Sequence, residues 1–97
     1  QRAIMISIII TTFKETRTIR KAIQSFLNQN LPKDYEILIV APDAETKEVV
    51  KDFLKNKKIT FIQDEGKGKP AALNLAFQQA KGDIFILTDG DVYCSDA

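Results

Sequence analysis

Four short runs of apolar residues alternate along this 97-residue chain with segments whose apolar residues recur at helical spacing. Apolar, β-branched runs of this length are typical of strands buried on both faces, and parallel strands need a crossover between them, usually a helix. Such crossovers are right-handed and carry the helices onto the faces of the sheet. We therefore predict an α/β fold, a parallel sheet with helices on both faces in the order β-α-β-α-β-α-β. The expected strands are residues 4–10, 36–40, 59–62 and a buried run that begins at residue 84 and ends in Asp89-Gly90-Asp91.

The three predicted helices are defined by apolar stripes and by residues suited to helix ends. Thr16 or Thr18 is suited to cap the first helix, Asp43 is suited to cap the second, and Pro70 suits the first turn of the third. Gly82 is a suitable C-terminal stop for the third helix. The expected inward-facing residues are Ile19, Ala22, Ile23, Phe26 and Leu27 in the first helix, Val49, Val50, Phe53 and Leu54 in the second, and Ala72, Leu73, Ala76, Phe77 and Ala80 in the third.

Composition excludes several kinds of site. The chain has no histidine and one cysteine, Cys94, so it can build neither a Ser-His-Asp triad nor a structural zinc site. Any metal must then be held by oxygen ligands, which favours Mg²⁺ or Mn²⁺. Fourteen basic against thirteen acidic residues give a net charge of +1, so we expect no nucleic-acid partner. The apolar stretch at residues 3–10 is too short to span a membrane, and residues 1–97 are expected to form a single domain.

The carboxyl ends of the strands are expected to form the ligand site, because open parallel sheets bind ligands there. The segments 11–15, 41–45 and 89–91 follow three of these ends. The two carboxylates of the last segment are suited to hold a divalent cation, and a cation there can hold a diphosphate. The loop 66–69, Gly-Lys-Gly-Lys, offers backbone amides, a helix N-terminus and two lysines to phosphate oxygens. Taken singly, each loop is also compatible with a solvated turn, and Asp43 with a helix cap.

Four motifs occur in order between residues 7 and 92. They are the strand and loop 7–15, the segment Gly-Lys-Pro-Ala-Ala-Leu-Asn at 68–74, the segment Ala-Lys-Gly-Asp at 80–83, and Asp-Gly-Asp at 89–91. In this order and spacing the chain resembles the family 2 glycosyltransferases, inverting enzymes of the GT-A fold that use nucleotide-diphosphate sugars. The opening loop of that family reads Pro-Thr-Tyr-Asn-Glu, so three residues match and two depart. The matches are Thr12, the aromatic Phe13 and Glu15, and the departures are Thr11 and Lys14.

The resemblance implies a GT-A-like half, a Rossmann-like unit that binds the sugar donor with Mg²⁺ or Mn²⁺, and a UDP-sugar is the expected donor. It also implies that Asp91 binds the metal directly and that Asp89 faces the ribose and the metal shell. The reaction would be displacement at the anomeric carbon, with the metal and a lysine stabilising the departing nucleoside diphosphate. The other donor-binding residues that it implies are Lys69 near the donor and Thr12, Phe13 and Glu15 beside the base and ribose.

Two departures from the family bear on these roles. The second strand of the family ends in Asp-Asp-Gly-Ser, whose carboxylate reads the base, whereas this chain has Ala41-Pro42-Asp43. Asp43 therefore either reaches the base or only caps the helix. The family's general base lies well after Asp-x-Asp, so we expect it beyond residue 97 and expect the chain alone to be inactive. The chain is then the donor-binding portion of a larger enzyme, cytoplasmic or at the cytoplasmic face of a membrane, whose open sheet edge here would allow self-association.

Two other functions stay open at the level of sequence. One is a sugar-phosphate nucleotidyltransferase, which would need a Gly-rich triphosphate loop after the first strand, where residues 11–15 contain no glycine. The other is a non-enzymatic α/β interaction module. Failure to bind any nucleotide would favour the second of these alternatives.

Overall fold

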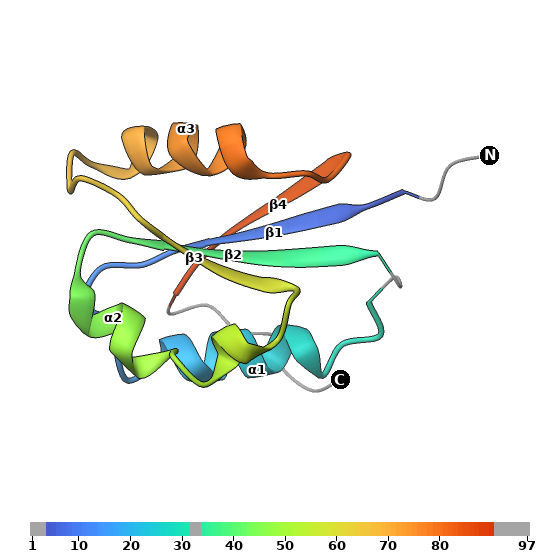
Figure 1. Cartoon of the computed structure of the whole chain (residues 1–97), viewed down its shortest axis with the longest axis horizontal. Coiled ribbons are helices and arrows are strands. Elements are labelled where there is room, and N and C mark those ends of the chain that lie inside the picture. The colour runs from blue at the N-terminus through green and yellow to red at the C-terminus, as the bar shows by residue number, and fades with distance from the viewer. Residues whose placement is uncertain (1–3, 32–33, 91–97) are drawn as a thin grey trace.

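The computed structural model describes residues 4–31 and 34–90. Within these residues, β1 (Ile6–Thr11), β2 (Tyr35–Ala41), β3 (Ile59–Gln63) and β4 (Ile84–Asp89) form one parallel sheet in the order β3-β2-β1-β4. The helices are α1 (Ile19–Leu27), α2 (Ala44–Val49) and α3 (Lys69–Gln79), and a 3₁₀ helix, η1, spans Phe53–Lys55. None of these described helices is long and apolar enough to cross a membrane. Because α3 covers one face of the sheet while α1 and α2 lie on the other (Figure 1), the predicted α/β fold is confirmed.

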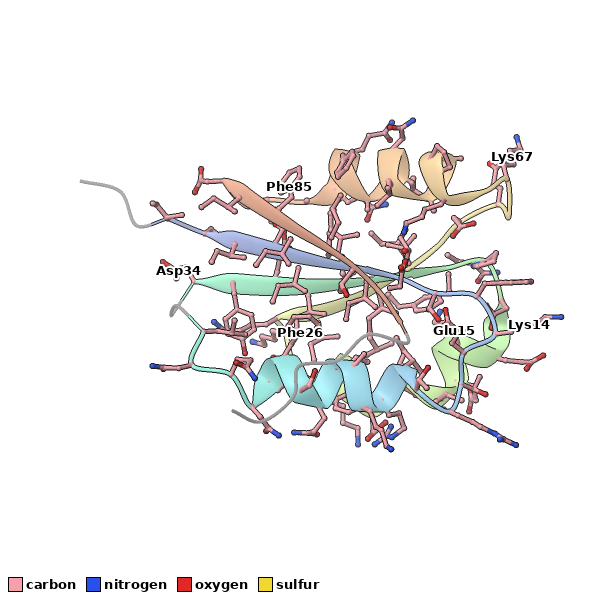
Figure 2. All side chains as sticks on the ribbon, turned by 180° about the vertical axis from the view of Figure 1, so that it is seen from behind. Lys14, Glu15, Phe26, Asp34, Lys67 and Phe85 are labelled. Carbon is pink, nitrogen blue, oxygen red and sulfur yellow. The ribbon has the colours of Figure 1, made fainter. Side chains whose placement is uncertain are left out.

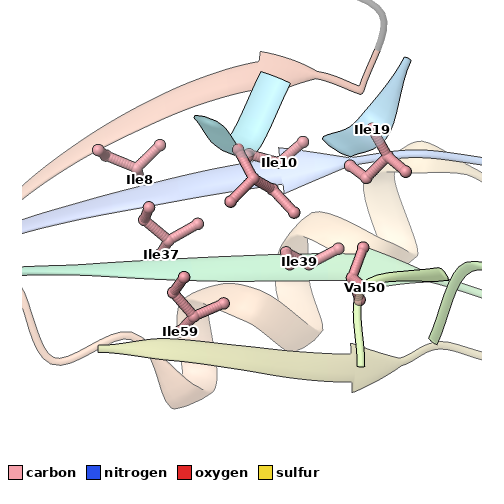
Figure 3. Close-up of a cluster of buried hydrophobic side chains, with 8 residues drawn as sticks. Ile8, Ile10, Ile19, Ile37, Ile39, Val50 and Ile59 are labelled. Carbon is pink, nitrogen blue, oxygen red and sulfur yellow. The ribbon is translucent and has the colours of Figure 1, made fainter. Parts of the chain in front are cut away.

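The two central strands, β1 and β2, are buried on both faces. On the face covered by α1 and α2, aliphatic side chains form one cluster (Figure 3), made of Ile8, Ile10, Ile19, Ile23, Ile37, Ile39, Val50 and Ile59. On the other face, α3 contributes two small side chains to a second cluster, made of Ile9, Leu38, Val40, Ile62, Ala72 and Ala76. Burying one large aliphatic side chain contributes about 1.5–3 kcal/mol, so these clusters are the main stabilising element of the fold.

The second helical segment is shorter than the sequence predicts. The α-helix ends at Val49, the buried Val50 is its C-cap, and Phe53 lies in the separate turn η1. Arg20 of α1 stabilises this break, because its Nη1 donates to the carbonyl oxygen of Val49 at 2.9 Å. That bond satisfies one of the carbonyls that a helix end leaves unpaired. The same guanidinium forms a two-bonded ion pair with the carboxylate of Asp52, at 2.6 and 2.9 Å.

Two predicted helix ends also differ in detail. Thr18 is the N-cap residue of α1, but its hydroxyl makes no capping bond. Instead, the carbonyl oxygen of Glu15 accepts the amides of Thr18 and Ile19, at 3.2 and 3.0 Å. The helix entry is therefore fastened to the loop that follows β1. At the end of α3 the C-cap is Ala80, so Gly82 is not the residue that stops the helix.

The prediction that the fourth strand is buried is wrong. The exposed fractions of Ile84, Phe85, Ile86 and Leu87 are 48%, 40%, 38% and 49%. The strand is at the edge of the sheet and, among the described residues, pairs only with β1. Phe77 of α3, also predicted to be buried, is 38% exposed. The ring of Phe77 stacks on that of Phe85 (labelled in Figure 2), with the ring centroids 5.4 Å apart. Through this contact α3 partly covers the edge strand.

The apolar edge at β4 leads us to expect self-association of this chain. Exposed apolar side chains on an edge strand favour pairing with another chain. In sedimentation equilibrium, the average mass should rise with protein concentration, and Leu87→Lys should shift it toward the monomer because an edge lysine opposes pairing. Ile4→Lys is the matched control, since Ile4 is 59% exposed but lies outside the strands. A strictly monomeric profile at high concentration would contradict this expectation.

Candidate functional site

A pocket of about 330 Å³ lies at the carboxyl ends of the strands, on the α3 side of the sheet. Its walls come from the loop after β1, the end of β2, the loop between β3 and α3, the first turns of α3 and the end of β4. Figure 2 shows Glu15 and Lys67, from the first and third of these segments, at the end of the sheet opposite Asp34. The structure thus brings together the strand-end segments that the sequence predicts to converge. The lining residues are Thr11, Thr12, Phe13, Glu15, Val40, Pro42, Asp64, Gly66, Gly68, Lys69, Ala72 and Asp89.

Lys69 and Asp89 form an ion pair at one end of this pocket. Lys69 Nζ lies 2.7 Å from Asp89 Oδ1, and the hydroxyl of Thr11 lies 3.2 Å from the same oxygen and donates to it. The hydrogen bond from Lys69 is the main cause that holds the pKa of Asp89 below its ordinary value, so the carboxylate is ionised at neutral pH. Both side chains are about half exposed, which leaves the pair accessible to a ligand.

The oxygens at this end of the pocket are suited to a hard divalent cation. The carboxylate of Asp89 and the hydroxyl of Thr11 are the kinds of donor that Mg²⁺ and Mn²⁺ prefer. In the part of the chain that the structure describes, no group of three or more acidic, cysteine or histidine side chains is gathered to hold a metal. A cation at Asp89 therefore needs further oxygen ligands. Asp91, the predicted direct ligand, lies outside the described residues.

The loop after β1 is held in place by contacts with β2 and within itself. The amide of Thr12 donates to the carbonyl oxygen of Val40 at 3.0 Å, and its hydroxyl donates to the carboxylate of Glu15 at 3.3 Å. Lys14 has a φ of 52°, a left-handed conformation that is uncommon for any residue but glycine. Phe13 is 61% exposed. These contacts hold Thr12, Phe13 and Glu15, three predicted donor-binding residues, in the pocket wall.

Asp43 makes its contacts with α2. Its carboxylate accepts hydrogen bonds from the amide of Thr46 at 3.0 Å and from the Thr46 hydroxyl at 2.6 Å, and the amide of Lys14 donates to it at 3.4 Å. Partial burial raises the pKa of Asp43, but the bonds from Thr46 and Lys14 together outweigh burial and lower it overall. Asp43 is not among the described residues that line the pocket. The predicted capping role is confirmed, and contact with a base stays a prediction.

The two lysines of the loop 66–69 occupy different positions. Lys69 begins α3 and lines the pocket, whereas Lys67 is 72% exposed, pairs with Glu65 at 2.9 Å and does not line it. Gly66 and Gly68 have φ values of 75° and 103°, which glycine adopts without the strain that a side chain would add. The loop therefore turns so that only one of its lysines reaches the site.

Sequence reasoning missed two features of the site. Asp64 follows β3 and lines the pocket, and the strand-end rule that singled out Asp43 and Asp89 would have found it. Gly90 is the second feature, because its amide donates to the carbonyl oxygen of Thr11 at 2.9 Å and a Cβ there would lie 2.6 Å from that of Thr12. No local pattern signals this close approach, because it depends on the pairing of β4 with β1.

Comparison with known proteins agrees with this geometry. Residues 7–97 match the family model described as Glycosyl transferase family 2. The chain belongs to this family. A dolichyl N-acetyl-alpha-D-glucosaminyl phosphate 3-beta-D-2,3-diacetamido-2,3-dideoxy-beta-D-glucuronosyltransferase of Methanococcus voltae is 35% identical over 94 residues, which cover 91% of this chain and 29% of the relative. The probable glycosyltransferase YdaM of Bacillus subtilis is 31% identical over 96 residues, which cover 89% of this chain and 22% of the relative. This family 2 chain thus spans less than a third of the length of these two relatives.

Solved structures show the same relationship. The mannosyltransferase PcManGT from Pyrobaculum calidifontis, in complex with GDP-Man and Mn²⁺, superposes with a TM-score of 0.84 at 26% identity. The superposition covers 94% of this chain and 28% of the mannosyltransferase chain. S. aureus TarS 1-349 in complex with UDP-GlcNAc superposes with a TM-score of 0.73 at 27% identity, and the superposition covers 91% of this chain and 27% of the TarS chain. The fold of this family 2 chain is therefore GT-A-like, as the resemblance implies.

Proposed function

We propose that this chain is the donor-binding region of a family 2 glycosyltransferase, and that it holds a nucleotide-diphosphate sugar through Mg²⁺ or Mn²⁺. The observation that carries the proposal is the pocket at the strand ends, with the Lys69–Asp89 pair at one end. The ligand class is supported by the two solved structures in complex with GDP-Man and Mn²⁺ and with UDP-GlcNAc. A UDP-sugar is the donor that we expect. Residues 1–97 are proposed to be one nucleotide-sugar-binding domain within a larger enzyme.

The proposed chemistry follows from the charges at this end of the pocket. The ammonium of Lys69 binds the diphosphate, whose negative charge grows as the bond to the sugar breaks. A divalent cation held by Asp89 and Asp91 supplies Lewis-acid stabilisation of the same charge when it is bound. Because Lys69 already lies at this end of the pocket, it needs little rearrangement as the charge develops. The base and ribose lie against Thr12, Phe13 and Glu15.

Inverting transfer is proposed for the whole protein, of which this chain is one part. The acceptor hydroxyl must lose its proton as it attacks the anomeric carbon, which requires a positioned base. We assign this general base to a part of the enzyme beyond residue 97. The 97-residue chain is therefore expected to bind the donor without transferring its sugar.

A titration of the ¹⁵N-labelled chain with UDP and Mg²⁺ tests the proposed function, and GDP with Mg²⁺ is the second ligand to use. Backbone amide shifts should cluster at residues 12–15, at Lys69 and at residues 89–91. Lys69→Met should weaken nucleotide binding about 10- to 100-fold, because a charged hydrogen bond contributes about 1.5–3 kcal/mol. Lys67→Met is the matched control, since it removes the same charge from the same loop outside the pocket. Equal losses in the two variants, or a well-dispersed spectrum that neither nucleotide changes, would contradict the proposal.

A further inference from the structure

The pocket reaches across the whole width of the sheet. In the strand order β3-β2-β1-β4, Asp89 ends the strand at one edge and Asp64 follows the strand at the other. Three strand spacings separate these edges, about 14 Å. Val40 and Pro42, at the end of β2, form an uncharged wall beside Asp64. A nucleoside diphosphate whose phosphates lie at Lys69 would therefore extend its base toward the β3 edge.

Asp64 is fixed at that edge by its backbone and by one of its two carboxylate oxygens. Its amide donates to the carbonyl oxygen of Ala41 at 3.0 Å, which continues the ladder between β2 and β3. Its Oδ1 accepts from the amide of Gly66 at 2.7 Å, which is an Asx turn. The side chain is partly buried, and its Oδ2 has no hydrogen-bond partner among the described residues. One acceptor oxygen of a fixed carboxylate thus faces no protein donor.

The other carboxylates around the pocket have partners too, but they differ from Asp64 in position. Asp89 ends β4 at the opposite edge, where it is paired with Lys69, and Glu15 lies in the loop after β1, where it accepts from the hydroxyl of Thr12. Asp43 accepts from α2 and lies outside the lining. Asp64 is therefore the carboxylate best placed to contact a ligand at the end of the pocket away from Lys69.

We infer that Asp64 reads the nucleobase by accepting the imino N–H of uracil or guanine. This inference rests on the proposed function. Uracil carries this hydrogen at N3 and guanine at N1, whereas the corresponding ring nitrogens of cytosine and adenine carry a lone pair that a carboxylate repels. A bond of this kind to an ionised acceptor is among the stronger hydrogen bonds in proteins. The carboxylate that selects the base thus comes from the end of β3 in this chain, and not from the end of β2.

N-methylated nucleotides and a nearly isosteric variant test this inference. UDP and N3-methyl-UDP, and GDP and N1-methyl-GDP, are titrated with Mg²⁺ into the wild-type chain and into Asp64→Asn. The asparagine keeps the Asx turn, because its amide oxygen can accept from Gly66, and it replaces the free oxygen with an N–H donor. Glu65→Gln is the matched control, since its charge neighbours Asp64 but lies outside this pocket.

For the nucleotide that the wild type binds, methylation should weaken binding about tenfold or more, and Asp64→Asn should weaken the unmethylated form by a similar factor. In Asp64→Asn the cost of methylation should fall to less than about threefold, since the bond is already lost and the two changes are coupled. Glu65→Gln should behave as wild type.

Three results would overturn the inference. No cost of methylation in the wild type, or the same cost in wild type and Asp64→Asn, would remove Asp64 from base reading and leave the proposed function in place. If the wild type binds neither UDP nor GDP, the proposed function and this inference both fail. If Asp64→Asn does not fold, the affinities of the wild type for the methylated and unmethylated nucleotides still test the inference. Equal affinities would contradict the contact between Asp64 and the base.

Discussion

Replacing Gly82 by alanine is expected to destabilise the fold by about 2–4 kcal/mol, because a methyl group there meets backbone atoms of β1 and of the residue before it. A Cβ on Gly82 would lie 2.7 Å from the amide nitrogen of Ser7 and 3.0 Å from the carbonyl oxygen of Met5. The segment cannot simply move away, since the amide of Gly82 donates to the hydroxyl of Ser7 at 2.8 Å and the amide of Asp83 donates to Met5 at 2.7 Å. The expected result is a lower midpoint in urea denaturation at an unchanged m-value.

Ser7→Ala, alone and combined with Gly82→Ala, shows which atoms cause the loss. The Ser7 hydroxyl also crowds the new methyl group, and it donates to the buried carboxylate of Glu36 at 2.7 Å. The amide of Lys81 donates to the same carboxylate at 2.6 Å, so this network fastens the start of β4 to β1 and β2. If the backbone contacts dominate, removal of the hydroxyl should not restore stability. Full rescue of Gly82→Ala by Ser7→Ala would contradict this explanation.

Local sequence predicts the elements of this fold better than it predicts their positions in the sheet. The runs at β1 and β4 are both mainly apolar, yet the side chains of β1 are buried on both faces and the first four of β4 are exposed. The difference arises because β1 is flanked by two strands and the described part of β4 pairs with one. Strand order depends on long-range pairing between strands, and the hydrophobic pattern within a single strand does not specify it.

In the candidate site, too, local sequence predicts the residues better than it predicts the contacts between them. Lys69 and Asp89 are both predicted from motifs, but the 2.7 Å bond between them is not, since it joins the start of α3 to the end of β4. The capping role of Asp43 is predictable because it depends on residues three positions apart. Asp64 belongs to no motif, but it directly follows β3, and the pairing of β3 with β2 places it beside the same pocket.

Asp91→Asn is expected to abolish the metal dependence of nucleotide binding. The carboxylate of Asp89 already accepts hydrogen bonds from the ammonium of Lys69 and the hydroxyl of Thr11. The sequence assigns the direct contact with the metal to Asp91, so metal binding should depend mainly on the carboxylate of Asp91. A carboxamide keeps the shape of this side chain but loses the charge that a hard cation requires. Calorimetric titrations of UDP with and without Mg²⁺ should show an increase in affinity with metal for the wild type and none for Asp91→Asn.

Asp43→Asn separates this effect from a general loss of acidic charge. Asparagine is also a good N-cap residue, so α2 should persist, and the loss of UDP affinity should be smaller than for Asp91→Asn, with metal dependence retained. Line broadening by Mn²⁺ gives a second measure, because a bound paramagnetic ion should broaden the amide signals of Thr11 and Asp89 in the wild type and not in Asp91→Asn. If Mg²⁺ raises the affinity of Asp91→Asn for UDP as much as that of the wild type, Asp91 is not the metal ligand. The cation would then have to be held without this carboxylate, with Asp89 giving up its bond to Lys69.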